Sequence, residues 1–234
     1  MKKRLYILLL LPLFFVSSCK DDIEGCTNEE ACNFNINATN TDDDSCEYPA
    51  IGYDCAGIFT AQIGDVIEGG YLFYLDETGE HGLVAALEDL TEGASDPYDL
   101  GYGGYEWGCF DSSVAGAAGV KIGTGYQNTL GIVAQNCQTE SGGVTAAQAA
   151  LNYTSNGYID WYLPSIDELL EMYNTLENGG LQSSIGGFET NDGPRYLSST
   201  EVTSSNVCYV YFANGNPTNN YKNHSYRVRA IRAF

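Results

Sequence analysis

Residues 157–173 read GYIDWYLPSIDELLEMY, and this stretch decides how the second half of the chain folds. The run from Asp160 to Leu163 is aromatic and branched, which predicts a short buried strand. Pro164 ends that extended run. Ser165, followed three residues later by Glu168, forms the capping-box pattern of a helix start. The stretch therefore predicts a strand, a sharp turn and a capped helix.

Apolar residues follow the cap at helical spacing and predict one buried helix face, formed by Ile166, Leu169, Leu170, Tyr173 and Leu176. We expect the helix to stop at Asn178-Gly179-Gly180, because glycine readily takes the left-handed conformation.

Strands are predicted on both sides of this helix. Two apolar runs, 70–76 and 82–87, flank a polar turn and predict a β-hairpin. Further strands are predicted over 195–201, 206–214 and 225–234, with a turn at 214–217. Short helices are predicted over 127–136 and 146–153, the second with a capping box formed by Thr145 and Gln148. Strands at both ends with helices between them predict an α+β fold with short antiparallel strands and long loops.

The first eighteen residues have the pattern of an export signal. Lys2, Lys3 and Arg4 precede an apolar run that is too short for a comfortable membrane span. The run ends in Val-Ser-Ser-Cys19, which resembles the lipobox of bacterial lipoproteins. That resemblance implies a signal peptide over 1–18, cleavage before Cys19 and a lipid on Cys19; a plain secretory signal is the alternative.

The tether after Cys19, residues 19–25, begins with Lys20-Asp21-Asp22. It resembles the tag that carries some outer-membrane lipoproteins to the cell surface, although a solvated tether would look similar. We therefore expect an outer-membrane, lipid-anchored and surface-exposed protein.

The chain is strongly acidic. It has 234 residues and a formal net charge of −21. Loss of the signal would leave seven basic against 31 acidic side chains, a charge of −24. Such a chain repels polyanions, which excludes nucleic-acid binding as a main role.

Residues 26–57 form a small cysteine-rich module with four cysteines: Cys26, Cys32, Cys46 and Cys55. A segment this short needs disulfides or a metal, and the export signal favours disulfides. Spacing leaves three pairings open. The segment resembles a short extracellular repeat, CxxxxACNxNxxAxxxDxSC, found as a spacer in bacterial surface proteins.

One acidic turn in this module is a candidate calcium site. Asn40, Asp42 and Asp44 are closely spaced oxygen donors, the kind of ligand that calcium takes. The turn lacks the glycine and the closing glutamate of an EF-hand, so a solvated turn is the alternative. No other cofactor is expected.

Residues 91–125 form a long irregular excursion, and loops of that length are usually functional or pinned. We expect a disulfide between Cys109 and Cys137 to pin it. Four of its aromatic residues form either an exposed sugar-stacking surface or the core beneath the loop: Tyr98, Tyr102, Tyr105 and Trp107.

Residues 60–234 resemble the Lcl C-terminal domain family of bacterial collagen-like adhesins and lipoproteins. The resemblance rests on IGDVIEGGYLFYLDETGEHGLVAA, EWGC, KIGTGYQNTLGIVAQNC, GYIDWYLPSIDELLEMY, YLSSTE and YRVRAIRAF. It implies a C-type-lectin-like fold with paired terminal strands, and adhesion that includes binding to glycosaminoglycan-type polysaccharide. It supplies no catalytic residues. Tyr196-Leu197 and Cys208 depart from the family pattern, and the sugar motifs of calcium-dependent lectins are missing.

No catalytic constellation is visible in the sequence. His81 and His224 are the two histidines, and they are not accompanied by a triad or by metal-ligand spacing. An oxidase of the sulfatase-modifying-factor type would need paired reactive cysteines, whereas Cys208 stands alone on an apolar strand. We therefore expect a protein that is not an enzyme.

The last 40 residues are basic, unlike the rest of the chain, and contain Arg195, Lys222, Arg227, Arg229 and Arg232. They form either an anion-binding strip or internal ion pairs of the last three arginines with Asp160, Asp167 or Glu168.

Together these patterns predict an adhesin that binds polysaccharide or a surface glycoprotein. Its predicted contacts are the four loop aromatics together with Arg195 and Lys222. A structural or protein-docking envelope lipoprotein is the alternative.

Overall fold

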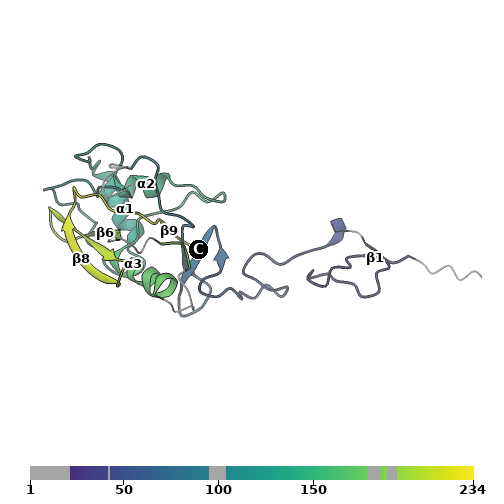
Figure 1. The fold of residues 1–234 in the computed structure, drawn as a ribbon. Helices are drawn as coiled ribbons and strands as arrows, with labels where there is room; N and C mark the ends of the chain where they lie inside the picture. The colour runs from purple at the N-terminus through teal and green to yellow at the C-terminus, as the bar shows by residue number, and fades with distance from the viewer. Residues whose placement is uncertain (1–21, 42, 95–103, 179–184, 189–193) are drawn as a thin grey trace, which may run out of the picture. The chain divides into compact units, whose positions relative to one another are not determined.

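The computed structural model describes residues 22–41, 43–94, 104–178, 185–188 and 194–234. The chain divides into two compact units, Met1–Ala50 and Ile51–Phe234 (Figure 1). The predicted signal peptide, Cys19 and the glycines expected to stop the central helix all lie outside the described residues. Within the described ranges, no helix combines the length and apolar character needed to cross a membrane.

The first unit is held by a disulfide and by short backbone pairings. β1 (Glu24–Gly25) runs parallel to β2 (Asn40–Thr41), and a 3-10 turn, η1, spans Asp43–Ser45. Cys26 pairs with Cys46 and is itself buried. Cys32 of this unit and Cys55, which belongs to the second unit, are also disulfide-bonded. The prediction that these four cysteines form disulfides is confirmed.

The second unit contains a four-stranded antiparallel sheet in the order β3-β4-β5-β9. Its strands are β3 (Val66–Ile67), β4 (Gly70–Leu75), β5 (Gly82–Ala85) and β9 (Ile231–Ala233). The predicted hairpin is β4–β5. Gly70 is required in it, because a Cβ there would clash with the Ala85 carbonyl on the paired strand. β9 pairs with β5 and so brings the C-terminus back beside the hairpin.

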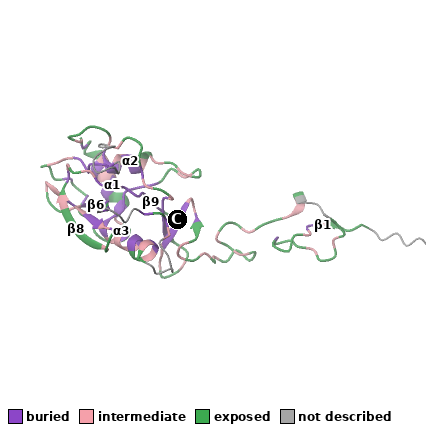
Figure 2. Ribbon diagram, in the orientation of Figure 1, coloured by how far each residue is buried: buried purple, intermediate pink, exposed green. Residues whose placement is uncertain are grey.

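A second antiparallel sheet has the order β6-β7-β8, with β6 at Arg195–Glu201, β7 at Asn206–Tyr211 and β8 at Asn216–Tyr221. β8 replaces the predicted turn at 214–217, which is therefore wrong beyond Gly215. It reads NPTNNY, is mostly exposed (Figure 2) and forms the sheet edge, where Pro217 is tolerated. Its polar sequence gave no strand signal.

Among the described residues, three α-helices connect the sheets, so the unit is α+β as predicted. α1 spans Gly125–Ala134 and α2 spans Ala146–Asn152, with the Thr145 hydroxyl accepting from Gln148 N–H (3.2 Å). α3 spans Ile166–Met172 and continues as a π-helical turn, η3, over Tyr173–Glu177. The capping box between Ser165 and Glu168 is present in both directions.

Several predicted strands differ in extent from those observed; β7, for example, ends at Tyr211 and not at residue 214. Residues 160–163 make a single bridge, in which Tyr162 and Ile231 exchange two backbone hydrogen bonds. The strand stops there because Leu163 N–H donates to the Thr129 hydroxyl instead (3.1 Å). The segment 225–234 is not one strand, because it changes partner along its length: Tyr226 bridges Tyr105, Arg227 bridges Tyr196, and only 231–233 joins β5.

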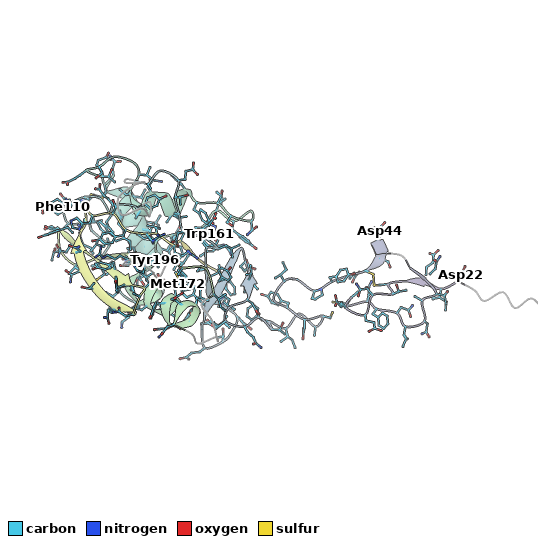
Figure 3. The ribbon with its side chains drawn as sticks, viewed as in Figure 1. Asp22, Asp44, Phe110, Trp161, Met172 and Tyr196 are labelled. Carbon is cyan, nitrogen blue, oxygen red and sulfur yellow. A yellow bond between two sulfur atoms is a disulfide. The ribbon has the colours of Figure 1, made fainter. Side chains whose placement is uncertain are left out.

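Two apolar clusters form the core. One contains Trp107 and Trp161 and packs the four-stranded sheet against α1 and α2. The other contains Met172 and Tyr196 and packs α3 against both sheets. Figure 3 shows the side chains of Trp161, Met172 and Tyr196 inside the unit. The Tyr196 and Phe212 rings lie 4.2 Å apart.

Candidate ligand-binding cleft

The predicted aromatic loop belongs to the core where the structure describes it. Tyr98 and Tyr102 lie outside the described residues. Tyr105 exchanges backbone hydrogen bonds with Tyr226 (2.8 and 3.1 Å), and Trp107 N–H donates to the Lys222 carbonyl (3.0 Å). These pairings turn both rings inward, where they are fully buried. The exposed-surface interpretation is therefore wrong for Tyr105 and Trp107, and the core alternative holds.

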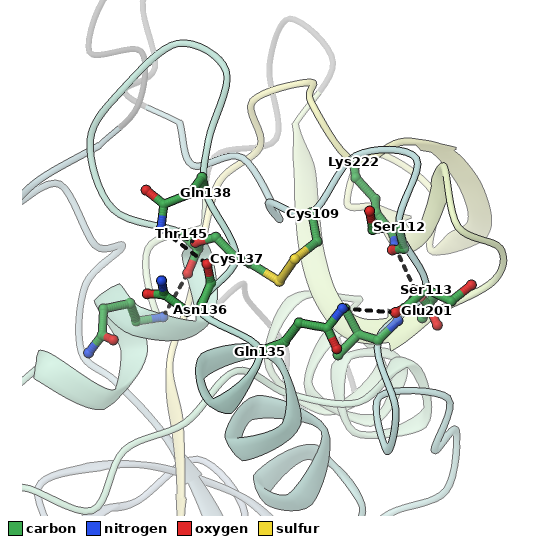
Figure 4. The surroundings of a disulfide bond; sticks show 12 residues. Cys109, Ser112, Ser113, Gln135, Asn136, Cys137, Gln138, Thr145, Glu201 and Lys222 are labelled. Carbon is green, nitrogen blue, oxygen red and sulfur yellow. Dashed lines mark hydrogen bonds and ion pairs between the residues drawn. A yellow bond between two sulfur atoms is a disulfide. The ribbon is translucent and has the colours of Figure 1, made fainter.

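Lys222 is also part of the core. Its Nζ donates to Glu201 Oε1 (2.6 Å) and to the Ser112 carbonyl (2.8 Å), and it lies 4.5 Å from the centre of the Trp107 ring (Figure 4). Burial lowers the pKa of this amine, although Glu201 opposes that shift. The prediction that Lys222 binds a ligand is wrong, because its charge holds the 107–114 segment against β6. Arg195 is exposed at the start of β6.

The arginines near the C-terminus are held by carboxylates. Arg232 pairs with Asp160 (2.5 Å) and Glu68 (3.0 Å), and Arg229 and Arg227 both pair with Asp89 (2.7 and 3.2 Å). The internal-pair alternative is confirmed for Arg232 and Asp160. For the other two arginines the partner is Asp89, which lies far away in the sequence.

The predicted disulfide of the excursion is confirmed. Cys109 pairs with Cys137 and closes a loop of 28 residues (Figure 4). Gln135 Nε2 donates to the Ser113 carbonyl (3.0 Å), and Glu201 Oε1 accepts from Val114 N–H (2.9 Å). Just after Cys109, the excursion is therefore tied to the C-terminal end of α1 and to β6.

A cleft of about 360 Å³ opens where this excursion begins. One side is the turn from Glu88 to Gly93, and the other is the end of α2, with Ala149, Asn152 and Tyr153. Tyr105 and Val144 complete the lining. The cleft therefore joins segments that lie some sixty residues apart in the sequence.

Asp89 fixes the turn that forms one wall of the cleft. Its Oδ1 accepts from Arg229 Nε (2.7 Å), and its Oδ2 accepts from the Tyr196 hydroxyl (2.8 Å) and Arg227 Nη1 (3.2 Å). Arg229 is almost fully buried, donates to the Ala86 carbonyl and stacks over Phe188 (4.2 Å). The wall is thus anchored to β6 and to the segment before β9 through a single carboxylate.

The rim of the cleft is polar and aromatic. Glu88, Glu92 and Asn152 are exposed, and the half-buried Tyr153 packs edge-on against Trp161 (5.3 Å). Gln148 Nε2 donates to Asn152 Oδ1 (2.8 Å), which sets the direction of that amide. The Tyr105 hydroxyl donates to the Glu92 carbonyl (2.7 Å).

A carboxylate at the rim shifts the pKa of the buried Tyr105. Burial and the nearby Glu92 carboxylate raise the pKa of Tyr105 to about 12, so this phenol stays protonated at physiological pH. The carboxylates can accept hydrogen bonds from hydroxyl groups, and the amide can both donate and accept them. The tyrosine ring can stack on an apolar sugar face.

Sequence reasoning missed the cleft because no single motif marks it. The one signal in the sequence that could have indicated the cleft is the need of buried arginines for a carboxylate partner. Arg227 and Arg229 in an apolar segment need a carboxylate partner, and Glu88-Asp89 directly follows the buried strand β5.

Neither a metal site nor a reactive thiol is assembled among the described residues. No group of three His, Cys, Asp or Glu side chains is placed to hold a metal there. Asn40 and Asp44 are exposed and Asp42 lies outside the described part, so calcium binding stays a prediction. Burial raises the pKa of the half-buried Cys208 thiol, which keeps it from acting as a thiolate near neutral pH.

The fold and the cleft define a disulfide-linked α+β domain whose wall carboxylate is held by arginines from the C-terminal segment. Residues 123–232 match the model of the Lcl C-terminal domain family. The match covers α1 to β9 and begins after Glu88–Tyr105. The disulfides before it fit a cysteine-rich N-terminal segment. No curated protein matches the chain.

Proposed function

We propose that this protein is a surface-exposed lipoprotein of the bacterial outer membrane, whose Lcl C-terminal domain binds polysaccharide or a surface glycoprotein without chemical change. The observation that carries the proposal is the cleft. It places a tyrosine, an oriented amide and acidic side chains around a volume that suits one or two sugar units.

The proposed location outside the cytoplasm supports a binding role. The basic and apolar pattern before Cys19, together with the disulfides of the N-terminal unit, suits a protein that works in an oxidising environment outside the cytoplasm. A lipid on Cys19 would hold the chain at the membrane, and the acidic tether would keep the domains in solvent.

A glycan array probed with the full-length protein tests this function. We expect binding to a subset of glycans, with loss of signal for Asn152→Ala because that change removes an oriented hydrogen-bonding group from the rim. Thr218→Ala, on the exposed edge strand β8, is the matched control and should bind as the wild type does. Equal binding by both variants would contradict the cleft as the binding site.

A protein-docking function is the second candidate, because one observation favours it. A larger cleft of about 770 Å³ lies beside the β4–β5 turn and is lined by Tyr53, Ile58 and Phe59, among others. Ile58 is 61% exposed and lines this cleft together with the Tyr53 and Phe59 rings, and adjoining exposed apolar groups can mark a docking surface. Ile58→Asp should abolish capture of a protein partner and leave glycan binding intact if this candidate is right.

A further inference from the structure

The groups that line the Glu88–Tyr153 cleft define the charge of the ligand it accepts. We propose that this cleft selects sugars that carry a free amine, as in a deacetylated amino-sugar polymer, over sulfated or carboxylated sugars. This inference rests on the proposed function, because it names the class of polysaccharide that the same cleft would bind.

The composition of the cleft favours a cationic ligand. Its ionisable lining consists of three acidic side chains, Glu88, Asp89 and Glu92, together with two tyrosines, and no described basic residue borders it. Asp89 is shared by two arginines, but Glu88 and Glu92 take part in none of the ion pairs of the described residues. Two exposed carboxylates therefore remain to meet a cation at the rim.

The basic side chains near the C-terminus, apart from the exposed Arg195, are held by carboxylates and so are not free to receive a sulfate group. Arg229 is buried and gives its donors to Asp89 and to the carbonyls of Ala86 and Gly186. Lys222 is buried against Glu201, and Arg232 against Asp160 and Glu68. A sulfated chain would therefore meet few accessible cations on a protein of net charge −21.

Besides its carboxylates, the cleft offers an aromatic ring and a side-chain amide. The half-buried Tyr153 ring offers an apolar face, and the oriented Asn152 amide offers a donor and an acceptor for neighbouring hydroxyl groups. The Tyr105 hydroxyl fixes the backbone from which the Glu92 side chain projects. An amino sugar uses all three features, since its ammonium meets a carboxylate while its ring stacks and its hydroxyls find the amide.

The test compares three probes on the full-length protein by calorimetry, below the pKa of the sugar amine. The probes are a glucosamine oligomer, its N-acetylated counterpart and a heparin oligosaccharide of equal length. We expect the glucosamine oligomer to bind about tenfold more tightly than the acetylated one, as a charge-assisted hydrogen bond would produce. The heparin probe should not bind.

Two double variants separate a local effect from the general charge of the chain. Glu88→Gln with Glu92→Gln should remove the preference for the amine while binding of the acetylated oligomer persists. Glu77→Gln with Glu80→Gln changes the net charge equally at the exposed β4–β5 turn and should keep the preference. Equal loss in both variants would overturn the inference, because long-range charge would then explain the preference.

The remaining outcomes distinguish this inference from the function on which it rests. Binding of the acetylated oligomer without an amine preference would contradict the inference and leave polysaccharide binding standing. Failure of all three sugars would overturn the inference, whereas binding of other glycans on the array would leave the proposed function standing. Tighter binding of oligolysine than of the glucosamine oligomer would also overturn the inference, since the cleft would then serve a basic peptide.

Discussion

At the scale of single residues, the second unit is organised by charged side chains that lie inside it. Asp89, Glu168, Glu201 and Arg229 each satisfy donors or acceptors from segments that are distant in the sequence. A buried charge of this kind contributes modestly when it is paired, but losing one partner leaves the other charge uncompensated.

Asp89 gives the sharpest test at this scale. Asp89→Asn should lower the free energy of unfolding by about 3–5 kcal/mol, because it leaves Arg227 and Arg229 without their carboxylate. Urea denaturation measures the effect. The neighbouring Glu88→Gln is the control, and as an exposed change it should stay within about 0.5 kcal/mol. Equal effects of the two variants would show that the arginines do not depend on Asp89.

Glu168 predicts a dependence on pH. Burial raises the pKa of this carboxyl above its usual range, although hydrogen bonds from the backbone N–H groups of Ser165 and Gly123 oppose the shift. A raised folded-state pKa means that the contribution to stability is complete below the unfolded pKa and is lost as pH rises through the folded pKa.

Glu168→Gln keeps one of the two acceptor oxygens at every pH, replaces the other with an NH2 group that cannot accept, and has no proton to release. The stability advantage of the wild type over this variant should therefore shrink as pH rises above about 4.5, the ordinary value for the group. Urea denaturation of both proteins at a series of pH values measures it. An advantage that grows with pH would contradict the assigned direction.

At the scale of elements, the described part of the excursion between β5 and α1 is held by a cross-link and by side-chain contacts. The disulfide between Cys109 and Cys137 closes 28 residues, and Lys222 ties the same segment to Glu201. Both contacts lie beside the buried Trp107, so the order of this segment depends on them.

Replacing both cysteines, as Cys109→Ser with Cys137→Ser, should lower the free energy of unfolding by about 3–4 kcal/mol, because the unfolded chain regains the freedom of the open loop. Chemical denaturation measures this loss. Peptide mapping under non-reducing conditions is the accompanying check, and a free thiol at either position of the wild type would contradict the pairing.

Elements with a local signal were predictable from the sequence, and those defined by distant partners were not. The Ser165–Glu168 cap and the β4–β5 hairpin carry their signals within a few residues. β8 has a polar sequence and becomes a strand only because β7 pairs with it. The cleft depends on the contact between Asp89 and Arg229, which are 140 residues apart in the sequence. A single sequence does not show which distant residues come into contact.

At the scale of the whole molecule, the proposed location and the proposed function rest on different parts of the chain. The location at the membrane depends on Cys19, and the binding function depends on the cleft. They can therefore fail independently.

Cys19→Ser should release the protein from membranes or leave it unprocessed, because the lipid would have no attachment point. Membrane fractionation and the mass of the mature chain measure the effect. Cys208→Ser is the matched control and should stay anchored. An unchanged mass and unchanged fractionation for Cys19→Ser would contradict the lipoprotein proposal.

Amide hydrogen exchange with and without bound oligosaccharide tests the central claim most directly. The full-length protein would be saturated with the glycan that binds most tightly on the array, and exchange would be followed peptide by peptide. Ligand in the cleft should slow exchange in residues 88–93 and 149–153 and leave the edge strand β8 unchanged. Protection confined to β8, or to the turn beside Ile58, would place the ligand elsewhere and contradict the cleft as the binding site.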